Sequence, residues 1–485
     1  VDPRNPREMG AFELGVDALR LVARTLEGAQ TEAYLPPSTT VTNAESSPEE
    51  TMENLGGQVA IGSTPEQGMI TLKEFKHWRP DTVRLYADRM VQFAQRRAGA
   101  PLLWTCRLSA PVTRVDERAI ERTLKRGVTF LASMQAREGH LVEKYGPTLR
   151  GIQTPENPLA LSQARALIGI SRYWELTRDD AARAVATRLA SALVELAESM
   201  GERAYFRRDE KTPPDTSWTA ECALALVRSP SADEHRELLE KLGAFLLSMQ
   251  EADGRIHQGY SMLLNRSLPT RTSEIGVTAL ALAELGHRLR RDDFSKAART
   301  SAEWLRIRRL RDLKAGKLSL GREEEFELFE RMALTDKAYL ELLDPVPGML
   351  TKVQFTGENA PYPDYIGTFR KPSRIGGFDI RARHAANCIR VLWAATQARK
   401  RAGRDVAAET QALARAARFL MQLQIEKDEA FYCPNPGAAH GLLRQDLVDP
   451  DMLLRDMGVS LTGLCHAMEA VGNRRYEFPA AKAPR

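Results

Sequence analysis

The stretch "FLLSMQEADGRI", residues 245–256, decides the fold of this chain. It is typical of the last turns of an amphipathic helix that run into an Asp-Gly turn. A close copy, "FLASMQAREGHL", begins at Phe130, and a weaker one, "FLMQLQIEKDEAFY", begins at Phe419. The three phenylalanines are separated by 115 and 174 residues, close to two and three periods of about 58 residues, enough for two helices and two loops. The stretch therefore marks the end of one helix in each unit of a helical repeat. A further copy is expected near Trp304, whereas the match fails near residues 188 and 361.

The second helix of each unit is apolar on more than one face and rich in Ala, Leu, Gly and Ser. Such helices belong in an interior layer, whereas the charged, one-sided helices belong outside. The links from an inner helix to the next outer helix are very short, and the links in the other direction run to about twenty residues. Long loops thus gather on one rim of a ring, where they are free to build a site. The expected inner helices span residues 158–176, 215–229, 272–289, 382–398 and 455–471.

This arrangement resembles the α/α toroids of six-hairpin glycosidases and of the terpenoid cyclase and prenyltransferase class. The resemblance covers roughly residues 115–472 and implies an all-α, (α/α)6-type toroid of helical hairpins. Because the repeated motif is structural, the resemblance says little about chemistry. We predict an N-terminal extension at 1–114, the toroid at 115–472 with an irregular insertion at 344–381, and a tail at 473–485.

Two regions depart from the repeat. Residues 321–343 are expected to form one acidic amphipathic helix, and the proline-rich insertion after it is either a lid or wall of the rim or a strap over the outside of the ring. In the N-terminal extension we expect helices at 7–28 and 80–99, a polar loop at 31–66, and one or two short strands within 100–115. These helices are too few to bury a core alone, so the extension should pack against the ring.

Composition excludes several classes of protein. The 485 residues carry 69 Lys and Arg against 64 Asp and Glu, interspersed along the chain, which argues against a nucleic-acid partner. No apolar run reaches the roughly 18 to 20 residues of a membrane span, so we expect a soluble protein. The chain begins without Met, and its compartment stays open, including export after removal of a signal peptide. Among five cysteines, Cys222, Cys388 and Cys465 lie in apolar helices, where thiols pack as small hydrophobes.

Most catalytic signatures fail. The chain lacks GxGxxG, GxxxxGK[ST], GxSxG, HExxH and CxxC motifs. The pairs Asp179-Asp180 and Asp292-Asp293 lie at short turns and are typical of helix N-caps, which disfavours a terpenoid cyclase. Cys465 and His466 are adjacent in a helix and point about 100° apart, so they are unsuited to one zinc ion. We therefore predict no metal and no cofactor.

Carboxylates at the starts of inner helices are the catalytic candidates. "SEIGVTALAL" and "RDMGVSLTGL" align Glu274 with Asp456, in units on opposite sides of a six-unit ring. Asp215, Glu221 and Asp379 occupy the starts of other inner helices. Glycosidases need such an acid and base on either side of the scissile bond. The alternative is that acids in a first turn only complement the helix dipole.

Aromatic and cationic residues on the long-loop rim are the binding candidates. Such groups stack on sugar rings and pair with carboxylate or sulfate groups. Two of them, Tyr145 and Tyr260, occupy one repeat position, which is also typical of packing within each unit. The full set is Tyr145, Trp218, His257, Tyr260, Arg381, Arg383, His384 and His440.

These features predict a carbohydrate-active enzyme, a hydrolase, lyase or epimerase, that acts on an oligosaccharide or polysaccharide in the rim cavity. Glu274 or Asp456 would donate a proton, with Asp215, Glu221 or Asp379 as its partner. The alternative is a non-catalytic toroid that binds a glycan or another small polar ligand, a peptide or a partner protein. The lack of a catalytic signature and the partial decay of the repeat favour this alternative.

Overall fold

The structure is a computed structural model of the chain. It describes residues 112–147, 158–209, 211–263, 266–269, 275–318, 323–360, 363–371, 380–426, 436–447 and 451–478. It also gives the backbone of the strands at 17–24, 30–35, 83–89, 92–94, 103–105 and 151–153.

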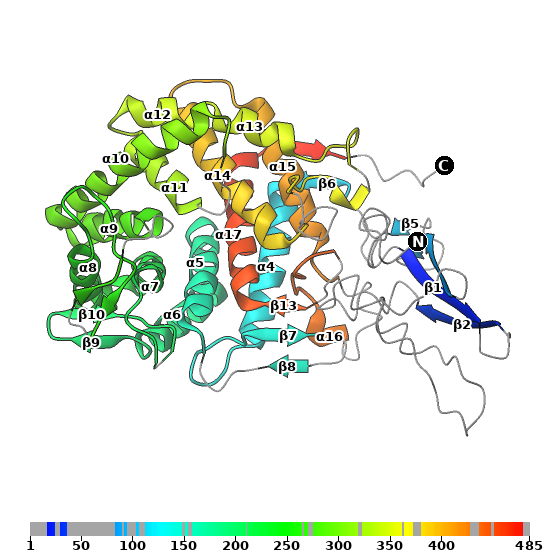
Figure 1. The fold of residues 1–485 in the computed structure, drawn as a ribbon, viewed down its shortest axis with the longest axis horizontal. Coiled ribbons are helices and arrows are strands. Elements are labelled where there is room, and N and C mark those ends of the chain that lie inside the picture. Colours follow the sequence, from blue (N-terminus) through cyan, green and yellow to red (C-terminus); the bar gives the residue numbers. More distant parts are fainter. Residues whose placement is uncertain are drawn as a thin grey trace.

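Six helices of the described residues form a closed inner ring. Each packs on the next along the chain, and the last, α17, packs on the first, α5, so that the red and teal helices lie side by side in Figure 1. In order they are α5 (Ala160–Thr177), α7 (Thr216–Arg228), α9 (Ile275–Leu289), α11 (Glu323–Met332), α14 (Ala382–Arg401) and α17 (Leu454–Val471).

Outer helices alternate with the inner ones. Each inner helix packs on the outer helix that follows it, and α17 packs on α4, which joins the two ends of the chain and closes the toroid. The outer helices are α4 (Glu117–Ser133), α6 (Asp180–Val194), α8 (Arg236–Ser248), α10 (Asp292–Lys314), the pair α12 (Lys337–Leu343) and α13 (Val346–Val353), and α15 (Ala407–Gln422). The all-α toroid expected from the repeat is thus confirmed.

The two ends of the ring differ in their connections, as the sequence predicts. At the end where inner helices finish, called the short-turn end, α5 leads to α6 and α9 to α10 within a few residues, and the 3-10 helix η2 (Ala232–His235) joins α7 to α8. At the long-loop end, where inner helices start, the links carry short strands and the helix α16 (Pro436–Ala439). These strands are β7 (Lys144–Gly146), β8 (Gly151–Gln153), β9 (Glu198–Met200), β10 (Arg203–Tyr205), β11 (Tyr260–Ser261), β12 (Arg266–Ser267) and β13 (Met452–Leu453).

Glycines let the inner helices approach closely. A Cβ atom at Gly458 of α17 would lie 2.6 Å from the backbone of α5, and one at Gly169 of α5 would lie 2.7 Å from the carbonyl oxygen of Gly458. Either would clash, so the closure of the ring between α5 and α17 depends on these two residues. Cys222, Cys388 and Cys465 are fully buried in this core, as expected.

The repeated stretch fastens neighbouring outer helices to one another. Its glutamine amide donates to a backbone carbonyl of the next outer helix, from Gln135 to Val185, Gln250 to Ala297, Gln354 to Ala412 and Gln424 to Thr123, over 2.7 to 3.2 Å. A glycine with positive φ follows each glutamine and packs against the same helix: Gly139, Gly254, Gly367 and Gly441. The copy at Gln354 ends α13 and has no recognisable counterpart in the sequence. The copy expected near Trp304 is wrong, because α10 continues through that residue to Lys314.

The region that breaks the repeat is more regular than predicted. The single helix expected at 321–343 is two helices, α11 and α12, and Asp336 caps the second by accepting from the amide of Ala338. The insertion expected to be irregular contains α13, which starts with Pro345 and Pro347 in positions where proline favours a helix, and the 3-10 helix η3 (Pro363–Tyr365). Residues 361–362 and 372–379 lie outside the described part of the chain.

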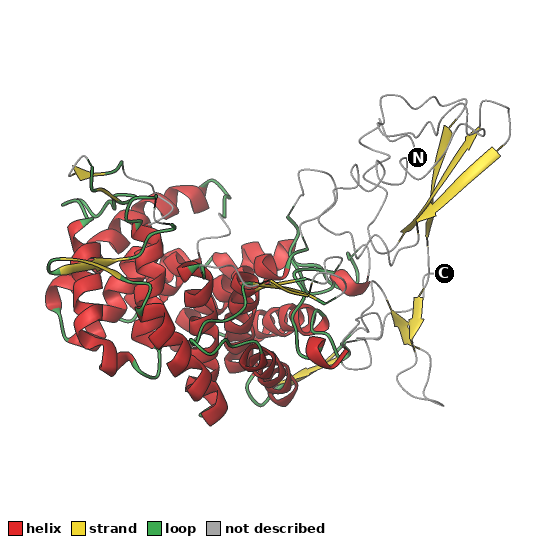
Figure 2. Ribbon diagram, turned by 90° about the horizontal axis from the view of Figure 1, so that it is seen from below, coloured by secondary structure: helices red, strands yellow, loops and turns green. Residues whose placement is uncertain are grey.

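The two helices expected in the N-terminal extension are wrong where the structure describes it. Strands β1 (Asp17–Arg24), β2 (Gln30–Leu35) and β3 (Val83–Arg89) form an antiparallel sheet in the order β2-β1-β3, to one side of the helices in Figure 2. Strands β4 (Gln92–Ala94) and β5 (Leu103–Thr105) form a second pair. For β3 the reason is that "VRLYADR" alternates apolar and polar residues with a period of two, which competes with a helical interpretation.

The toroid begins and ends at one small sheet, in which β6 (Arg114–Asp116) pairs with β14 (Arg475–Glu477). The strands expected within 100–115 are therefore present as β5 and β6, while the boundary at residue 114 remains a prediction. Among the described residues, no helix is long and apolar enough to cross a membrane.

Candidate functional site

Helix α11 brings carboxylates into the middle of the ring. Glu323, Glu325, Glu327 and Glu330 are each at most 6% exposed, which is rare for carboxylates unless cations pair with them. Arg309 of α10 pairs with Glu325 at 2.5 Å on the outer side of the helix. The remaining glutamates meet arginines from other inner helices, so a charged network runs through the ring.

Arg390 of α14 lies at the centre of this network and is only 5% exposed. Its guanidinium donates to Glu323 at 3.1 Å, to Glu324 at 2.9 Å and to Glu327 at 2.8 Å. These glutamates are one and four residues apart on α11 and share one face of that helix. Arg390 therefore connects the carboxylates at the long-loop end with those at the short-turn end.

Carboxylates outnumber arginines around Glu324, at the long-loop end. Arg165 of α5 forks onto Glu221 of α7, with contacts of 2.6 and 3.3 Å. Burial raises the pKa of Glu324 to about 8, and the charges of Glu323 and Glu221 add to this against Arg390 and Arg165. Glu324 is 13% exposed, and its raised pKa favours the protonated form, which can donate a proton.

A second charged group lies at the same end, on the first turns of α14 and α17. Asp456 is buried and accepts from Arg455 at 3.2 Å, and Arg383 approaches its carboxylate to 3.7 Å. Burial lowers the pKa of Arg383, which also feels the positive charge of Arg165. His384 is buried one residue later, with its Nε2 4.0 Å from the sulfur of Cys388. Glu221, Asp456, Arg383 and His384 thus lie in the first two turns of their inner helices, as do Glu324 and Arg165, which were not predicted from the sequence.

The other catalytic candidates are placed differently. Asp215 is the N-cap of α7, where its carboxylate accepts from the amide of Trp218 at 3.0 Å and the hydroxyl of Ser217 at 2.7 Å. This is the capping alternative left open by the sequence, and Trp218 packs half-buried against the core. Glu274 and Asp379 lie outside the described residues.

The binding candidates on the long loops are spread rather than gathered. Tyr145 is buried with its ring edge-on to Phe130, at 5.7 Å between centroids, which fits packing within the unit. Tyr260 lies half-buried in the β11-β12 pair. In the same loop, Nδ1 of His257 lies 2.9 Å from the carbonyl of Leu268. The remaining two are Arg381, exposed just before α14, and His440, whose buried Nδ1 has no partner in the described part of the chain.

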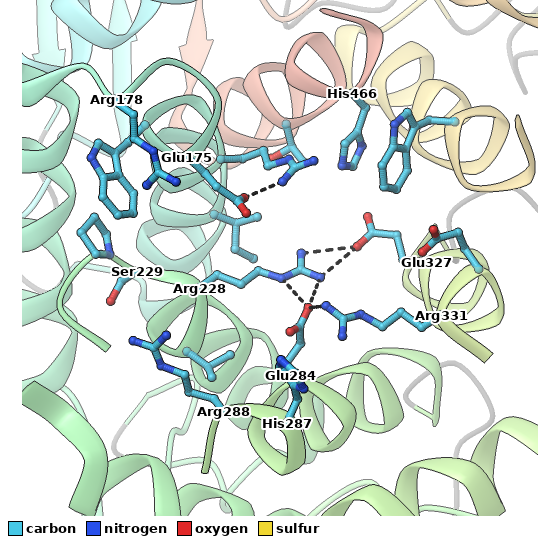
Figure 3. Close-up of a pocket in the computed structure, with 18 residues that line it drawn as sticks. Glu175, Arg178, Arg228, Ser229, Glu284, His287, Arg288, Glu327, Arg331 and His466 are labelled. Carbon is cyan, nitrogen blue, oxygen red and sulfur yellow. Dashed lines mark hydrogen bonds and ion pairs between the residues drawn. The ribbon is translucent and has the colours of Figure 1, made fainter. Parts of the chain in front are cut away.

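A pocket of about 430 Å³ opens at the short-turn end, on the opposite side of the ring from the predicted rim. Figure 3 shows Arg228 reaching across it, with Glu327 and Glu284 on one side and Glu175 and Arg178 on another. This pocket was not predicted from the sequence, because a site was expected only at the long loops. Its lining includes Arg172, Trp174, Glu175, Arg178, Arg228, Ser229, Glu284, His287, Arg288, Glu327, Glu330, Arg331, Trp393, Thr462 and His466.

Arginines dominate the electrostatics of this pocket. Arg228 of α7 donates to Glu284 of α9 at 2.8 Å and lies 3.3 Å from Glu327, while Arg331 reaches Glu284 at 2.5 Å. Burial opposes ionisation of Glu284 and Glu327. The charges of the neighbouring guanidinium groups together outweigh burial and lower the pKa of both carboxyls. These glutamates are therefore ionised counter-charges and poor proton donors.

Two buried rings form one wall of the pocket. Trp393 of α14 and His466 of α17 stack with centroids 4.0 Å apart and planes 7° from parallel. Burial lowers the pKa of His466 well below its ordinary value, so the imidazole is neutral. Within the described residues, the Trp393 Nε1 and His466 Nδ1 atoms are buried and have no hydrogen-bond partner.

The described residues contain no group of three or more His, Cys, Asp or Glu side chains arranged to hold a metal ion.

The fold is shared with solved carbohydrate-active enzymes. A D-mannose isomerase is 12% identical to this chain with a TM-score of 0.53, over 72% of this chain and 97% of the isomerase. A sugar epimerase from a ruminal bacterium is 13% identical with a TM-score of 0.51, over 72% and 98% of the two chains. The GH76A α-1,6-mannanase from Salegentibacter sp. HEL1_6 is 11% identical with a TM-score of 0.51, over 73% and 100%. No protein-family model matches the chain, and no curated protein matches it in sequence. At such identities the likeness concerns the fold alone.

Proposed function

We propose that this protein is a carbohydrate-active enzyme in which Glu324 is the general acid and Glu221 is the carboxylate that works with it. The observation that carries the proposal is the pKa of Glu324, which burial raises to about 8. An acid with a pKa near the working pH is what proton donation to a glycosidic or ring oxygen requires.

The surroundings of the two carboxyl groups fit separate roles. Glu221 is held in place by two contacts with Arg165, which orient its carboxylate for a role as base or nucleophile. Glu324 keeps its proton because of burial and because Glu323 and Glu221 are close enough to repel a further negative charge. A carboxyl group with a raised pKa beside a second carboxyl group is a usual basis for dividing acid and base roles.

This assignment revises the one made from the sequence. Glu324 takes the role of proton donor first given to Glu274 or Asp456. Asp456 instead pairs with Arg383 and Arg455, which suits it to orienting those cations toward a sugar hydroxyl or carboxylate. Glu274 and Asp379, predicted from the sequence as catalytic carboxylates, are now proposed to help bind the substrate. Arg381, His384 and the long-loop residues Tyr260, His257 and His440 remain proposed contributors to substrate binding.

Hydrolysis, elimination and epimerisation each need a general acid and a general base at the sugar, and carboxyl groups can fill both roles. The toroid is shared with an isomerase, an epimerase and a mannanase, so the fold is compatible with each of these reactions. We favour hydrolysis or epimerisation of a neutral hexose unit as the first reactions to test.

A non-catalytic glycan-binding toroid is the second candidate. One observation favours it: Glu221, Glu324 and Asp456 all pair with arginines and could serve only to neutralise them. The two candidates differ in whether removing the acidic proton changes turnover or only stability.

The test uses the purified chain with D-mannose and α-1,6-mannotetraose, and follows product by chromatography. Glu324→Gln and Glu221→Gln should each lower turnover by about 10²- to 10⁴-fold while substrate still binds. Glu303→Gln, which breaks an exposed pair with Arg306 on α10, is the matched control and should keep full activity. Unchanged turnover in both Glu324 and Glu221 variants would overturn the assignment. Binding of the sugars without any turnover by the unaltered chain would favour the second candidate.

A further inference from the structure

We propose that the pocket at the short-turn end is a second binding site, for a small polar molecule that carries a carboxylate or phosphate group. It is separate from the proposed catalytic carboxyls, because it lies beyond Arg390 at the opposite end of the ring. A volume of about 430 Å³ is within the range of small-molecule sites, roughly 300 to 1,000 Å³.

The guanidinium groups of the pocket are placed to bind an anion. Five arginines and four glutamates line it, and two of the arginines, Arg172 and Arg288, also pair with Glu469 and Asp233 outside the lining. Arg228 and Arg331 share Glu284, so two guanidinium groups converge on one carboxylate. Arg228 and Arg331 have side chains 25% and 37% exposed, which leaves part of each guanidinium accessible from the pocket. A ligand oxyanion would complete their pairing.

Arg178 supplies a cation that is not committed to a carboxylate. Among the described residues it forms no ion pair, and its guanidinium lies over the ring of Trp174, 4.9 Å from the centroid. Its backbone is left-handed, with φ of 57°, at the end of α5, where glycine is the usual residue. Arg290 has the same backbone conformation at the end of α9, so the conformation belongs to the repeated turn, and only the position of the side chain over the pocket is particular to Arg178.

Trp393 and His466, whose rings stack to form one wall of the pocket, add hydrogen-bonding groups that lack partners among the described residues. Trp393 is 9% exposed and His466 is 4% exposed, and both line the pocket. Within the described residues their Nε1 and Nδ1 atoms have no hydrogen-bond partner, and a buried polar group left so costs about 1 to 3 kcal/mol. The Trp393 N–H can only donate, so it calls for an acceptor such as a ligand oxygen.

Together these groups recognise an oxyanion on a molecule about the size of a monosaccharide. Arg178, Arg228 and Arg331 provide the cations, and Trp393 donates to an oxygen. The same groups suit a sugar carboxylate and a sugar phosphate, because both present oxygens that arginine binds in a fork. A neutral sugar would leave Arg178 without a counter-charge.

The test measures binding of four probes by calorimetry: glucuronate, glucose 6-phosphate, inorganic phosphate and neutral glucose. We expect one or both anionic sugars to bind more tightly than about 1 mM, and glucose to bind no better than that. The two anionic sugars show whether the carboxylate or the phosphate is preferred, and inorganic phosphate shows whether the oxyanion alone suffices. Failure of every anionic probe to bind, or equal binding of glucose, would overturn the proposal.

Two matched variants locate the site. Arg178→Gly should lower the affinity by about tenfold or more, since it removes the free cation, and glycine suits the left-handed backbone so the fold should persist. Arg290→Gly is the control: Arg290 has the same left-handed backbone, with φ of 58°, at the end of α9, and it does not line the pocket. Equal affinities in the two variants would contradict the proposal.

Two further variants separate this site from the catalytic one. Trp393→Phe keeps an aromatic ring beside His466 but removes the N–H, and should weaken binding several-fold. Glu324→Gln should leave binding of the anionic probes unchanged, even if it abolishes turnover. If Glu324→Gln abolished binding while Arg178→Gly did not, the anion would sit at the long-loop end and the present proposal would be wrong, whatever the fate of the proposed activity.

Discussion

The two ends of the ring are built from the same kinds of residue but differ in which charge is in excess. Around Glu324, at the long-loop end, carboxylates crowd together, and burial with their mutual repulsion raises its pKa to about 8. Around Arg228, at the short-turn end, guanidinium groups crowd together and lower the pKa of Glu284 and Glu327. Helix α11 contributes glutamates to both ends. Whether a buried glutamate acts as an acid or as a counter-ion is thus decided by the helices that face it.

Arg390 connects the two ends, and its removal should have the largest effect. Arg390→Met would leave Glu323, Glu324 and Glu327 without the cation that they share. Removing one partner of a buried ion pair in this way lowers the free energy of unfolding by about 3 to 5 kcal/mol. Urea unfolding followed by circular dichroism measures the loss. Arg255→Met is the control, because its pairs with Glu251 and Asp253 are exposed and should contribute about 0 to 1 kcal/mol. Equal losses in the two variants would show that the ends are not joined through Arg390.

A change at the long-loop end tests whether that end depends on the contacts between outer helices. Gly254 has φ of +93°, and an added Cβ would lie 2.5 Å from the carbonyl oxygen of Thr300 on α10. Gly254→Ala should therefore lower the free energy of unfolding by about 3 kcal/mol, the upper part of the range for such strain.

The matched control is Gly316→Ala, at the end of α10. Gly316 also has positive φ, +69°, but no atom lies within 4 Å of an added Cβ, so its loss should be nearer 1 kcal/mol. Similar losses for the two glycines would mean that backbone conformation alone matters and that the packing of the repeated turn contributes little.

The two ends should respond to pH with opposite sign. The pKa of Glu324 is raised from its ordinary 4.5 to about 8, so its contribution to stability is complete below pH 4.5 and is lost as the pH rises from 4.5 to about 8. The pKa of Glu284 is lowered, so its contribution is present above pH 4.5 and is lost as the pH falls below that value. Proposed activity should fall above pH 8, when Glu324 loses its proton.

Two variants isolate these contributions in thermal unfolding measured from pH 3 to pH 9. Glu324→Gln should flatten the decline of stability between pH 4.5 and 8, and Glu284→Gln should flatten the decline on the acid side. If both variants changed the same limb of the profile, the assignment of opposite charge excess to the two ends would fail.

The fold could be predicted because its signal is repeated. The stretch ending at Gln135 and Gln250 recurs with one spacing, and each glutamine makes the same contact with the next outer helix. Helix α11 was predicted as part of a helix but was not recognised as an inner one. Its buried face is acidic, whereas the other five inner helices were recognised by their apolar composition. The N-terminal strands were not predicted, because the apolar residues of these segments were read with a helical period rather than a period of two.

The candidate site could be predicted only in part. Glu221, Asp456 and Arg383 were found because each lies near the start of an apolar helix, a position visible along the chain. Glu324 and the short-turn pocket depend on pairs such as Arg390–Glu327 and Arg228–Glu284, which join different helices. No local pattern fixes such pairs. A requirement that six hairpins fill the ring would have identified residues 323–332 as the missing inner helix, and with it the acidic centre.

The smallest expected effect comes from removing a carboxylate where arginines are already in excess. Glu175 is 54% exposed and pairs with Arg172, which also contacts Glu469, so Glu175→Gln should change the free energy of unfolding by less than about 1 kcal/mol. It should, however, tighten binding of glucuronate or glucose 6-phosphate two- to threefold or so, because the pocket gains net positive charge. Weaker binding in Glu175→Gln would show that Glu175 orients Arg172 for the ligand rather than competing with it.

The same chemical change at the other end should lower the free energy of unfolding more, since Glu221→Gln leaves Arg165 without its bidentate partner. The contrast between these two substitutions is therefore the most sensitive measure of how unequal the two ends of the ring are.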